Sequence, residues 1–473
     1  MKKKISILCL ILCLSLITFF GCGVISLPAG PKYDDAVYGN GGFAVVKGDY
    51  LYFANAYIDY NNIGRYENKY AEDKEKELYN IYRAKLNDFG LIDLDSNGNP
   101  VGVELLVPQV GGFAYSGLYI CGDYLYYATP KTEVDGNGKD VKGLVSFDRV
   151  KINGENHETV YNMTSYSSSC SYEIVYIDGV TYLTIFDTNS NLIVVKIQGG
   201  NIQKYDGDVN DFFAKNVVSY ALYNQQNVKY NESLSQVNKY IYYVTKDCNY
   251  YNLYRKLLSN ANSQAEPLIT SSLSEIKVLE VKNDRLYYLE DGILTSSNFE
   301  QNSVKKQYSS FTIKTDAESS STNEIVSYVI QKDTEGTAID KGIIATYKDG
   351  DGNYVVASLN GSEKSTLFTK NSEKQVKLLF ANGNNVYYKL GDETVLYKYN
   401  VLSREEIVVA NSFNTSVSDE SNNVFDFDTE RVFYFNSVNG SSVKYLHMAQ
   451  INQFGYTDSE NNFIGHYIGK LTV

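Results

Sequence analysis

Residues 122–127 read Gly122-Asp123-Tyr124-Leu125-Tyr126-Tyr127, a two-residue turn followed by an aliphatic and aromatic strand. Gly and Asp adopt the positive φ angles that tight hairpin turns need, and Tyr and Leu suit a half-buried strand. The same phrase recurs in varied form along the chain, at residues 48–53, 178–183, 238–243, 283–288, 341–347, 383–388 and 428–434. The sequence is therefore built from an internal repeat.

Each copy of the phrase has further strand-like segments around it. Residues 276–281 precede one copy, residues 252–257 follow another, and short apolar pieces such as 406–409 close the unit. Four antiparallel strands per unit, repeated at intervals of roughly 40–75 residues, are typical of propeller blades. We predict an all-β fold, a β-propeller of four-stranded antiparallel sheets, with eight blades favoured and seven as the alternative. A pair of β-sandwiches is the competing interpretation.

A known family shares this blade phrase. The matching stretches are Leu125-Tyr126-Tyr127-Ala128 with Val145-Ser146-Phe147, and Ile241-Tyr242-Tyr243-Val244 with Leu253-Tyr254-Arg255. They resemble the YWTD-type propeller of low-density-lipoprotein receptors, in the divergent form found in bacterial lipoproteins. The resemblance covers roughly residues 42–471, although this chain has no Trp at all. It implies the fold and leaves the ligand open.

The N-terminus has the features of a secretory signal. Lys2, Lys3 and Lys4 precede an apolar run over residues 5–20, which is shorter than the roughly 20 residues that span a bilayer as a helix. The segment Phe19-Phe20-Gly21-Cys22 then resembles the lipobox of bacterial lipoproteins, which implies lipid on Cys22. A plain cleaved signal or an uncleaved anchor helix remains the alternative.

These features predict the organisation and location of the chain. We expect a signal peptide over residues 1–21, a tether over 22–42 and a propeller domain over 43–473. The predicted location is the cell membrane, lipid-anchored, on the extracytoplasmic face. The net charge of −13 and the lack of a basic stripe argue against nucleic-acid binding.

Candidate metal ligands occur once in a recognised spacing. Asp93, Asp95 and Asn97, followed by Gly98 and by Glu104, match the calcium-loop pattern D-x-D-x-N-G-x5-E. An ordinary hairpin turn accounts for the same residue types, so we assign no cofactor and keep calcium as a candidate. Beyond Cys22 only Cys121, Cys170 and Cys248 remain, too few and too widely spaced for a disulfide framework or a CxxC metal site.

The sequence contains no recognisable catalytic constellation. It has three His residues and neither a G-x-S-x-G elbow nor an H-E-x-x-H helix, and its many acids cannot be paired from spacing alone. We predict a non-catalytic binding or protein-interaction module for an unknown protein or glycan ligand, held at the membrane by its lipid. The alternatives are a glycan-acting hydrolase or lyase, and the solute-binding lipoprotein of a transporter, which would be α/β.

Overall fold

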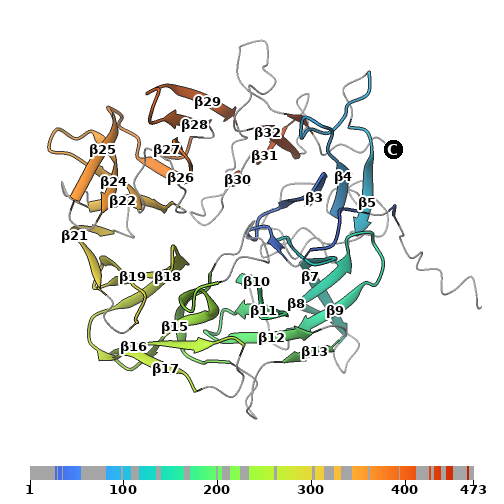
Figure 1. Cartoon of the computed structure of the whole chain (residues 1–473), viewed down its shortest axis with the longest axis horizontal. Coiled ribbons are helices and arrows are strands. Elements are labelled where there is room, and N and C mark those ends of the chain that lie inside the picture. Colours follow the sequence, from blue (N-terminus) through green and yellow to red (C-terminus); the bar gives the residue numbers. More distant parts are fainter. Residues whose placement is uncertain are drawn as a thin grey trace, which may run out of the picture.

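The computed structural model consists almost entirely of strands arranged in a ring (Figure 1). It describes residues 27–28, 30–34, 36–54, 81–96, 100–107, 117–134, 140–163, 171–198, 201–204, 213–223, 234–259, 264–300, 304–313, 324–331, 343–360, 363–393, 395–411, 425–427, 431–437, 444–450 and 466–467. No helix within those ranges is long and apolar enough to cross a membrane. The predicted signal segment and Cys22 lie outside them.

The strands form units of four, here called blades and numbered along the chain. Blade 1 consists of β2 Ala44–Lys47, β3 Tyr50–Ala54, β4 Ile81–Lys85 and β5 Val103–Val107, and blade 2 consists of β6 Tyr119–Cys121, β7 Tyr124–Val134, β8 Asp140–Lys151 and β9 Glu158–Asn162. Blade 3 consists of β10 Ser171–Ile177, β11 Val180–Phe186, β12 Leu192–Gln198 and β13 Asn201–Lys204. Blade 4 consists of β14 Val217–Ala221, β15 Tyr240–Asp247, β16 Tyr250–Leu257 and β17 Glu266–Ser272. A 3₁₀ turn, Val237–Lys239, precedes β15.

Blades 5 to 8 continue in the same way. Blade 5 consists of β18 Ile276–Lys282, β19 Arg285–Glu290, β20 Ile293–Ser297 and β21 Lys306–Ile313, and blade 6 consists of β22 Glu324–Ile330, β23 Ile343–Lys348, β24 Tyr354–Asn360 and β25 Glu363–Lys370. Blade 7 consists of β26 Val376–Asn382, β27 Asn385–Leu390, β28 Val395–Asn400 and β29 Glu406–Asn411. Blade 8 consists of β30 Phe425–Phe427, β31 Arg431–Ser437, β32 Lys444–Gln450 and β33 His466–Tyr467. The predicted all-β fold of four-stranded antiparallel sheets is confirmed.

The described strands form seven hydrogen-bonded sheets, one of which has eight strands. That sheet contains blades 5 and 6, which are joined by a short parallel pairing of Thr312 and Ile313 with Glu324 and Ile325. Within each half the pairing is antiparallel. The seven sheets therefore contain eight four-stranded units.

The turn phrase found in the sequence makes the hairpin between the first and second strands of a blade. Gly48 and Gly122 have φ of 59°, and the Asn283-Asp284 turn has φ of 52° and 55°. A positive φ at these positions suits Gly, Asn and Asp. The residues that follow each turn enter the second strand, where the tyrosines are buried.

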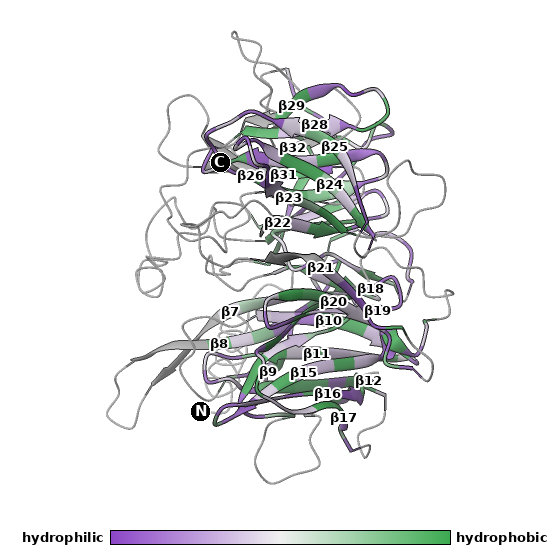
Figure 2. Ribbon diagram, turned by 90° about the vertical axis from the view of Figure 1, so that its left-hand side faces the viewer, coloured by the Kyte–Doolittle hydropathy of each residue, from purple (hydrophilic) through white to green (hydrophobic). Residues whose placement is uncertain are grey.

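Each blade packs against the next through a cluster of buried side chains. The clusters of the described residues join successive blades around the ring. The last of them brings Phe433 and Met448 of blade 8 against Leu51 and Phe53 of blade 1, which closes the circle. Figure 2 shows apolar residues along the strands and polar residues at their ends.

Tyrosine fills much of the space between blades. The rings of eight tyrosines from second or third strands are less than 2% exposed, namely those of Tyr52, Tyr82, Tyr127, Tyr182, Tyr242, Tyr288, Tyr387 and Tyr388. Burying an aromatic ring contributes about 2–3 kcal/mol relative to leaving it in water. These tyrosines therefore serve as core residues.

The two ends of the ring can be told apart by their connections. The first-to-second and third-to-fourth strand connections lie at one end, and the second-to-third and blade-to-blade connections lie at the other, because the strands of a blade alternate in direction. The described residues of 27–38, which we call the strap, lie along the first end. We call that end the strap face and the other the opposite face.

The strap changes the boundary predicted for the tether. Within it, strand β1 (Val37–Tyr38) pairs antiparallel with β6 of blade 2, and Ala36 and Val37 are buried. The Leu27 amide donates a hydrogen bond to the Asn153 carbonyl. The described residues of 27–42, expected to belong to a tether, therefore form part of the folded body because they fill the junction between blades 1 and 2.

Candidate functional site

The predicted calcium ligands do not converge on one point. Asp93 and Asp95 are exposed, and Asn97 lies outside the described residues. The Asn87 side-chain amide donates to Asp93 over 2.8 Å, and Glu104 pairs with Arg83 over 2.7 Å. In the part of the chain that the structure describes, no three His, Cys, Asp or Glu residues are grouped closely enough to hold a metal ion.

This arrangement makes a prediction for metal dependence. Glu104, which would complete the ion's shell, instead carries the charge that balances a buried guanidinium. We expect the melting temperature to be the same with 2 mM calcium and with excess chelator. A rise of several degrees on adding calcium would show that the loop at Asp93 rearranges to bind the ion.

Arg83 is the most buried cation of the described residues and holds the strap in place. Its side chain is fully buried, and its Nη atoms donate to the Ile152 carbonyl at 3.2 Å and the Pro28 carbonyl at 2.7 Å. Its guanidinium also lies 5.1 Å from the ring centre of Tyr50. One side chain thus joins blade 1, blade 2 and the strap.

The same grouping occurs in two other blades. Arg149 pairs with Glu158 and stacks on Tyr124, and Arg255 pairs with Glu266 and stacks on Tyr240. In each blade the arginine lies on the third strand, opposite a tyrosine of the second. Because the grouping repeats, it belongs to the blade architecture. Its signal in the sequence is a Tyr-Arg pair on the third strand in two of the three blades, Tyr82-Arg83 and Tyr254-Arg255, whereas Arg149 follows Asp148.

A second polar contact anchors the strap near the ring centre. The Lys47 ammonium is 1% exposed, donates to the Gly122 carbonyl at 2.7 Å and lies 3.3 Å from the Asp34 carboxylate. The Tyr38 hydroxyl donates to the same carboxylate at 2.8 Å. Burial, and next the hydrogen bond to Asp34, raise the pKa of Tyr38. Charge-assisted bonds therefore tie the strap to Lys47 of blade 1, and Lys47 in turn joins blade 1 to blade 2.

Similar bonds link the first turns of several blades across the strap face. Lys239 of blade 4 pairs with Asp178 of blade 3, and the Asn238 amide donates to Asp284 of blade 5. The Asn283 amide donates to the Gln331 carbonyl of blade 6, and the Gln331 amide donates to the Gly383 carbonyl of blade 7. These bonds stiffen the strap face.

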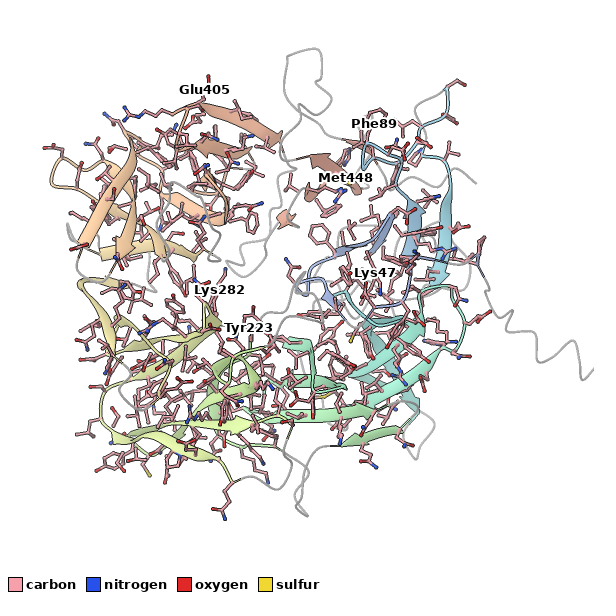
Figure 3. All side chains as sticks on the ribbon, in the orientation of Figure 1. Lys47, Phe89, Tyr223, Lys282, Glu405 and Met448 are labelled. Atoms are coloured by element: carbon pink, nitrogen blue, oxygen red, sulfur yellow. The ribbon has the colours of Figure 1, made fainter. Side chains whose placement is uncertain are left out.

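The innermost strands place two carboxyl groups beside the ring centre. Glu173 on β10 is half-buried, and burial raises its pKa to about 7. Glu280 on β18 also has a raised pKa because of burial, which Lys282 at 3.9 Å partly offsets. Figure 3 shows Lys282 and Tyr223 close to the centre of the ring. A carboxyl group that titrates near neutral pH could bind a cation or exchange a proton.

His157 lies in a cluster that resembles a catalytic triad in composition only. The Ser146 hydroxyl donates to Asp148 at 2.6 Å, while Asp148 lies 3.5 Å from His157 Nε2. His157 also stacks on the ring of Tyr127. The hydroxyl faces the carboxylate and not the imidazole, so the order needed to activate a serine is missing.

Two cysteines lie among the described residues. Cys121 is buried and Cys248 is exposed, and neither is in a disulfide. The Cys121 sulfur lies 3.4 Å from the Thr181 hydroxyl of the next blade. Cys170 lies outside the described residues.

Comparison with known proteins assigns the chain to no family. No protein-family model matches the chain, and no curated protein matches it. Among solved structures, a chain of the nidogen/laminin complex is similar at 10% identity and a TM-score of 0.27, covering 69% of this chain and 88% of that one. BamB from Moraxella catarrhalis is similar at 11% identity and a TM-score of 0.35, covering 72% and 95%. A prolyl endopeptidase is similar at 12% identity and a TM-score of 0.42, and this chain covers 59% of its length.

The propeller fold implied by the YWTD-type resemblance is confirmed, together with the strand order described above. The described residues form an all-β ring, whereas the solute-binding lipoprotein of a transporter would be α/β, so that alternative does not fit the fold.

Proposed function

We propose that the protein is a non-catalytic binding module held on the extracytoplasmic face of a membrane by lipid on Cys22. The observation that carries the proposal is that the strap fixes the chain to the ring a few residues after Cys22. Leu27 is bonded to Asn153, and five peptide units separate it from Cys22, which span at most about 17 Å. Two acyl chains on Cys22 would suffice for stable anchoring, and the short link would keep the ring beside the membrane.

The closed ring supports a binding role. Buried clusters and cross-linked turns fix its faces before any ligand arrives, and a preorganised surface loses little conformational entropy on binding. A protein or glycan ligand would then meet a rigid surface on the opposite face or at the ring centre.

Lipid on Cys22 can be tested directly in bacteria. We expect the wild-type chain to fractionate with membranes and to carry a diacylglyceryl mass on its N-terminal cysteine. Cys22→Ser should remove that mass, because serine lacks the acceptor thiol, and should leave the uncleaved precursor. A Cys13→Ser variant is the matched control and should be processed as the wild type. A processed, lipid-free N-terminus in the wild type would contradict the anchor.

The binding role is tested by capture from envelope extract. Residues 23–473, immobilised through the N-terminus so that the opposite face is accessible, should retain one partner or glycan with micromolar affinity or better. Direct titration of the purified partner against this chain must reproduce the binding. Turnover of an envelope glycan without any stable complex would overturn the non-catalytic proposal.

Glu173 favours a hydrolase or lyase as the second candidate. A carboxyl group with a pKa of about 7 is suited to general acid catalysis on glycosidic bonds. On this candidate, Glu173→Gln would abolish glycan cleavage, whereas a binding module would show no cleavage in either form.

A further inference from the structure

We propose that the strap face rests on the membrane, with the exposed apolar side chains of its connections in contact with the lipid headgroup layer. The proposal deepens the proposed function and rests on the anchor at Cys22. It names the bilayer surface as the partner of one face and leaves the opposite face for the ligand.

The first support is the point at which the chain leaves the ring. Leu27 lies against Asn153, in the third-to-fourth strand connection of blade 2. From there the strap runs inward past Gly48 and Gly122, the first turns of blades 1 and 2. The chain between Leu27 and Cys22 therefore begins at the strap face, and its short reach places that face next to the anchor.

The second support is a set of exposed apolar side chains on the same face. Phe89 in blade 1, Val304 in blade 5 and Leu402 in blade 7 are 72%, 76% and 65% exposed. All three lie in third-to-fourth strand connections. Tyr33 of the strap and Val101 of blade 1 are 63% and 49% exposed on this face. Single exposed apolar residues are common, so their position beside the anchor gives them significance.

Their arrangement suits a flat partner. Blades 1, 5 and 7 lie at separate positions around the ring, and Figure 3 shows Phe89 and Glu405, close to Leu402 in sequence, at different places on its rim. A plane touching these tips would contact the whole face. A peptide or a small ligand would reach only one of them.

Charged residues accompany the apolar tips. Lys32 adjoins Tyr33, Lys305 adjoins Val304 and Arg404 follows Leu402 by two residues. Lys305 pairs with Glu290, which lies at the far end of β19, while Asp88 and Glu405 lie near the tips in sequence, so the charges beside the tips are of both signs. Apolar and aromatic side chains flanked by Lys or Arg are typical of segments at a membrane interface. With the chain's net charge of −13, contact should depend on the apolar tips and the anchor more than on electrostatic attraction.

The opposite face provides matched controls. Its exposed apolar residues include Val218, Tyr250 and Leu273, which are 42%, 46% and 75% exposed. It also carries Cys248, an exposed thiol in the second-to-third strand turn of blade 4.

The orientation can be measured with the tether supplied chemically. Residues 23–473 carry an N-terminal hexahistidine tag in place of residues 1–22 and bind vesicles of phosphatidylethanolamine, phosphatidylglycerol and a nickel-chelating lipid. A donor dye is placed on Cys248 in a Cys170→Ser background, or on Leu402→Cys in a Cys170→Ser, Cys248→Ser background. We expect energy transfer to a headgroup-labelled acceptor to be at least threefold more efficient from position 402. Equal efficiency, or higher efficiency from Cys248, would overturn the proposal.

A second measurement separates contact from tethering. On the same vesicles without nickel lipid, Phe89→Ser, Val304→Ser and Leu402→Ser combined should weaken binding at least fivefold. Val218→Ser, Tyr250→Ser and Leu273→Ser combined should change it less than twofold. Equal effects of the two sets would contradict the assigned face. Because the tag replaces Cys22, failure of the orientation is distinguishable from failure of lipidation, which the mass of the native N-terminus reports.

Discussion

Replacing Arg83 by methionine is expected to lower the free energy of unfolding by about 3 kcal/mol, because a buried cation with several partners is lost. Methionine approximates the length of the side chain but leaves Glu104 without its counter-charge and the Pro28 and Ile152 carbonyls without their donor. An unsatisfied buried carbonyl costs about 1–3 kcal/mol. The strap should also become sensitive to protease before the ring unfolds. Thermal or urea unfolding with timed proteolysis checks both effects.

Arg255→Met is the matched control for the strap. Like Arg83, Arg255 pairs with a glutamate, Glu266, and stacks on a tyrosine, Tyr240. Its side chain is 13% exposed and lies in blade 4, away from the strap. We expect it to cost about 1 kcal/mol, in the range of a partly solvated ion pair. If both variants lose the same stability, the strap contributes nothing and Arg83 is only another blade residue.

Replacing Glu173 by glutamine is expected to change how stability depends on pH. The folded protein holds the Glu173 proton up to about pH 7, whereas the ordinary value is 4.5. Between these values the folded state binds more protons than the unfolded state, so the group's contribution is present at pH 4.5 and is lost as pH rises through 7. As pH rises from 4.5 to 7, the free energy of unfolding of the wild type should therefore fall by up to about 3 kcal/mol relative to that of Glu173→Gln.

The comparison needs a carboxyl group that is solvated in the folded state. Glu363 on β25 is exposed, and Glu363→Gln should follow the wild-type pH profile. Melting temperatures measured at half-unit steps from pH 4.5 to 8 give the three curves. Glu173→Gln should match the wild type near pH 4.5 and exceed it at pH 8. Parallel curves at every pH would mean that Glu173 is as well solvated as Glu363.

The blades could be predicted because their signals are local. A two-residue turn such as Gly122-Asp123 needs a positive φ, which the residue types reveal. The aliphatic and aromatic residues that follow the turn predict a buried strand. The predicted strand at residues 276–281 corresponds to β18, and the eight turn phrases fall at the hairpins or second strands of the eight units.

The strap could not be predicted because its stability comes from distant residues. Residues 27–34 contain Pro28, Gly30 and Pro31 and have no strand pattern, and their partners Arg83 and Ile152 come much later in the chain. The calcium pattern at Asp93 was ambiguous for a related reason. Its spacing identifies oxygen ligands but does not show that the pairing of β4 with β5 sets Glu104 opposite Arg83.

The raised pKa of Glu173 has no signal in the sequence. An acid within a strand such as β10 is usually solvated, and only the surrounding blades determine how much water reaches it. The apolar tips on the strap face are likewise unremarkable in sequence. Their common position follows from the strand order, which places every third-to-fourth connection at one end of the ring.

Ring closure is the claim on which the faces, the strap and the orientation all depend, and a crystal structure of residues 23–473 tests it most directly. We expect Phe433 and Met448 of blade 8 to pack on Leu51 and Phe53 of blade 1, with the strap lying between blades 1 and 2. An open arc whose last blade does not touch the first, or two facing layers of sheet, would contradict the account.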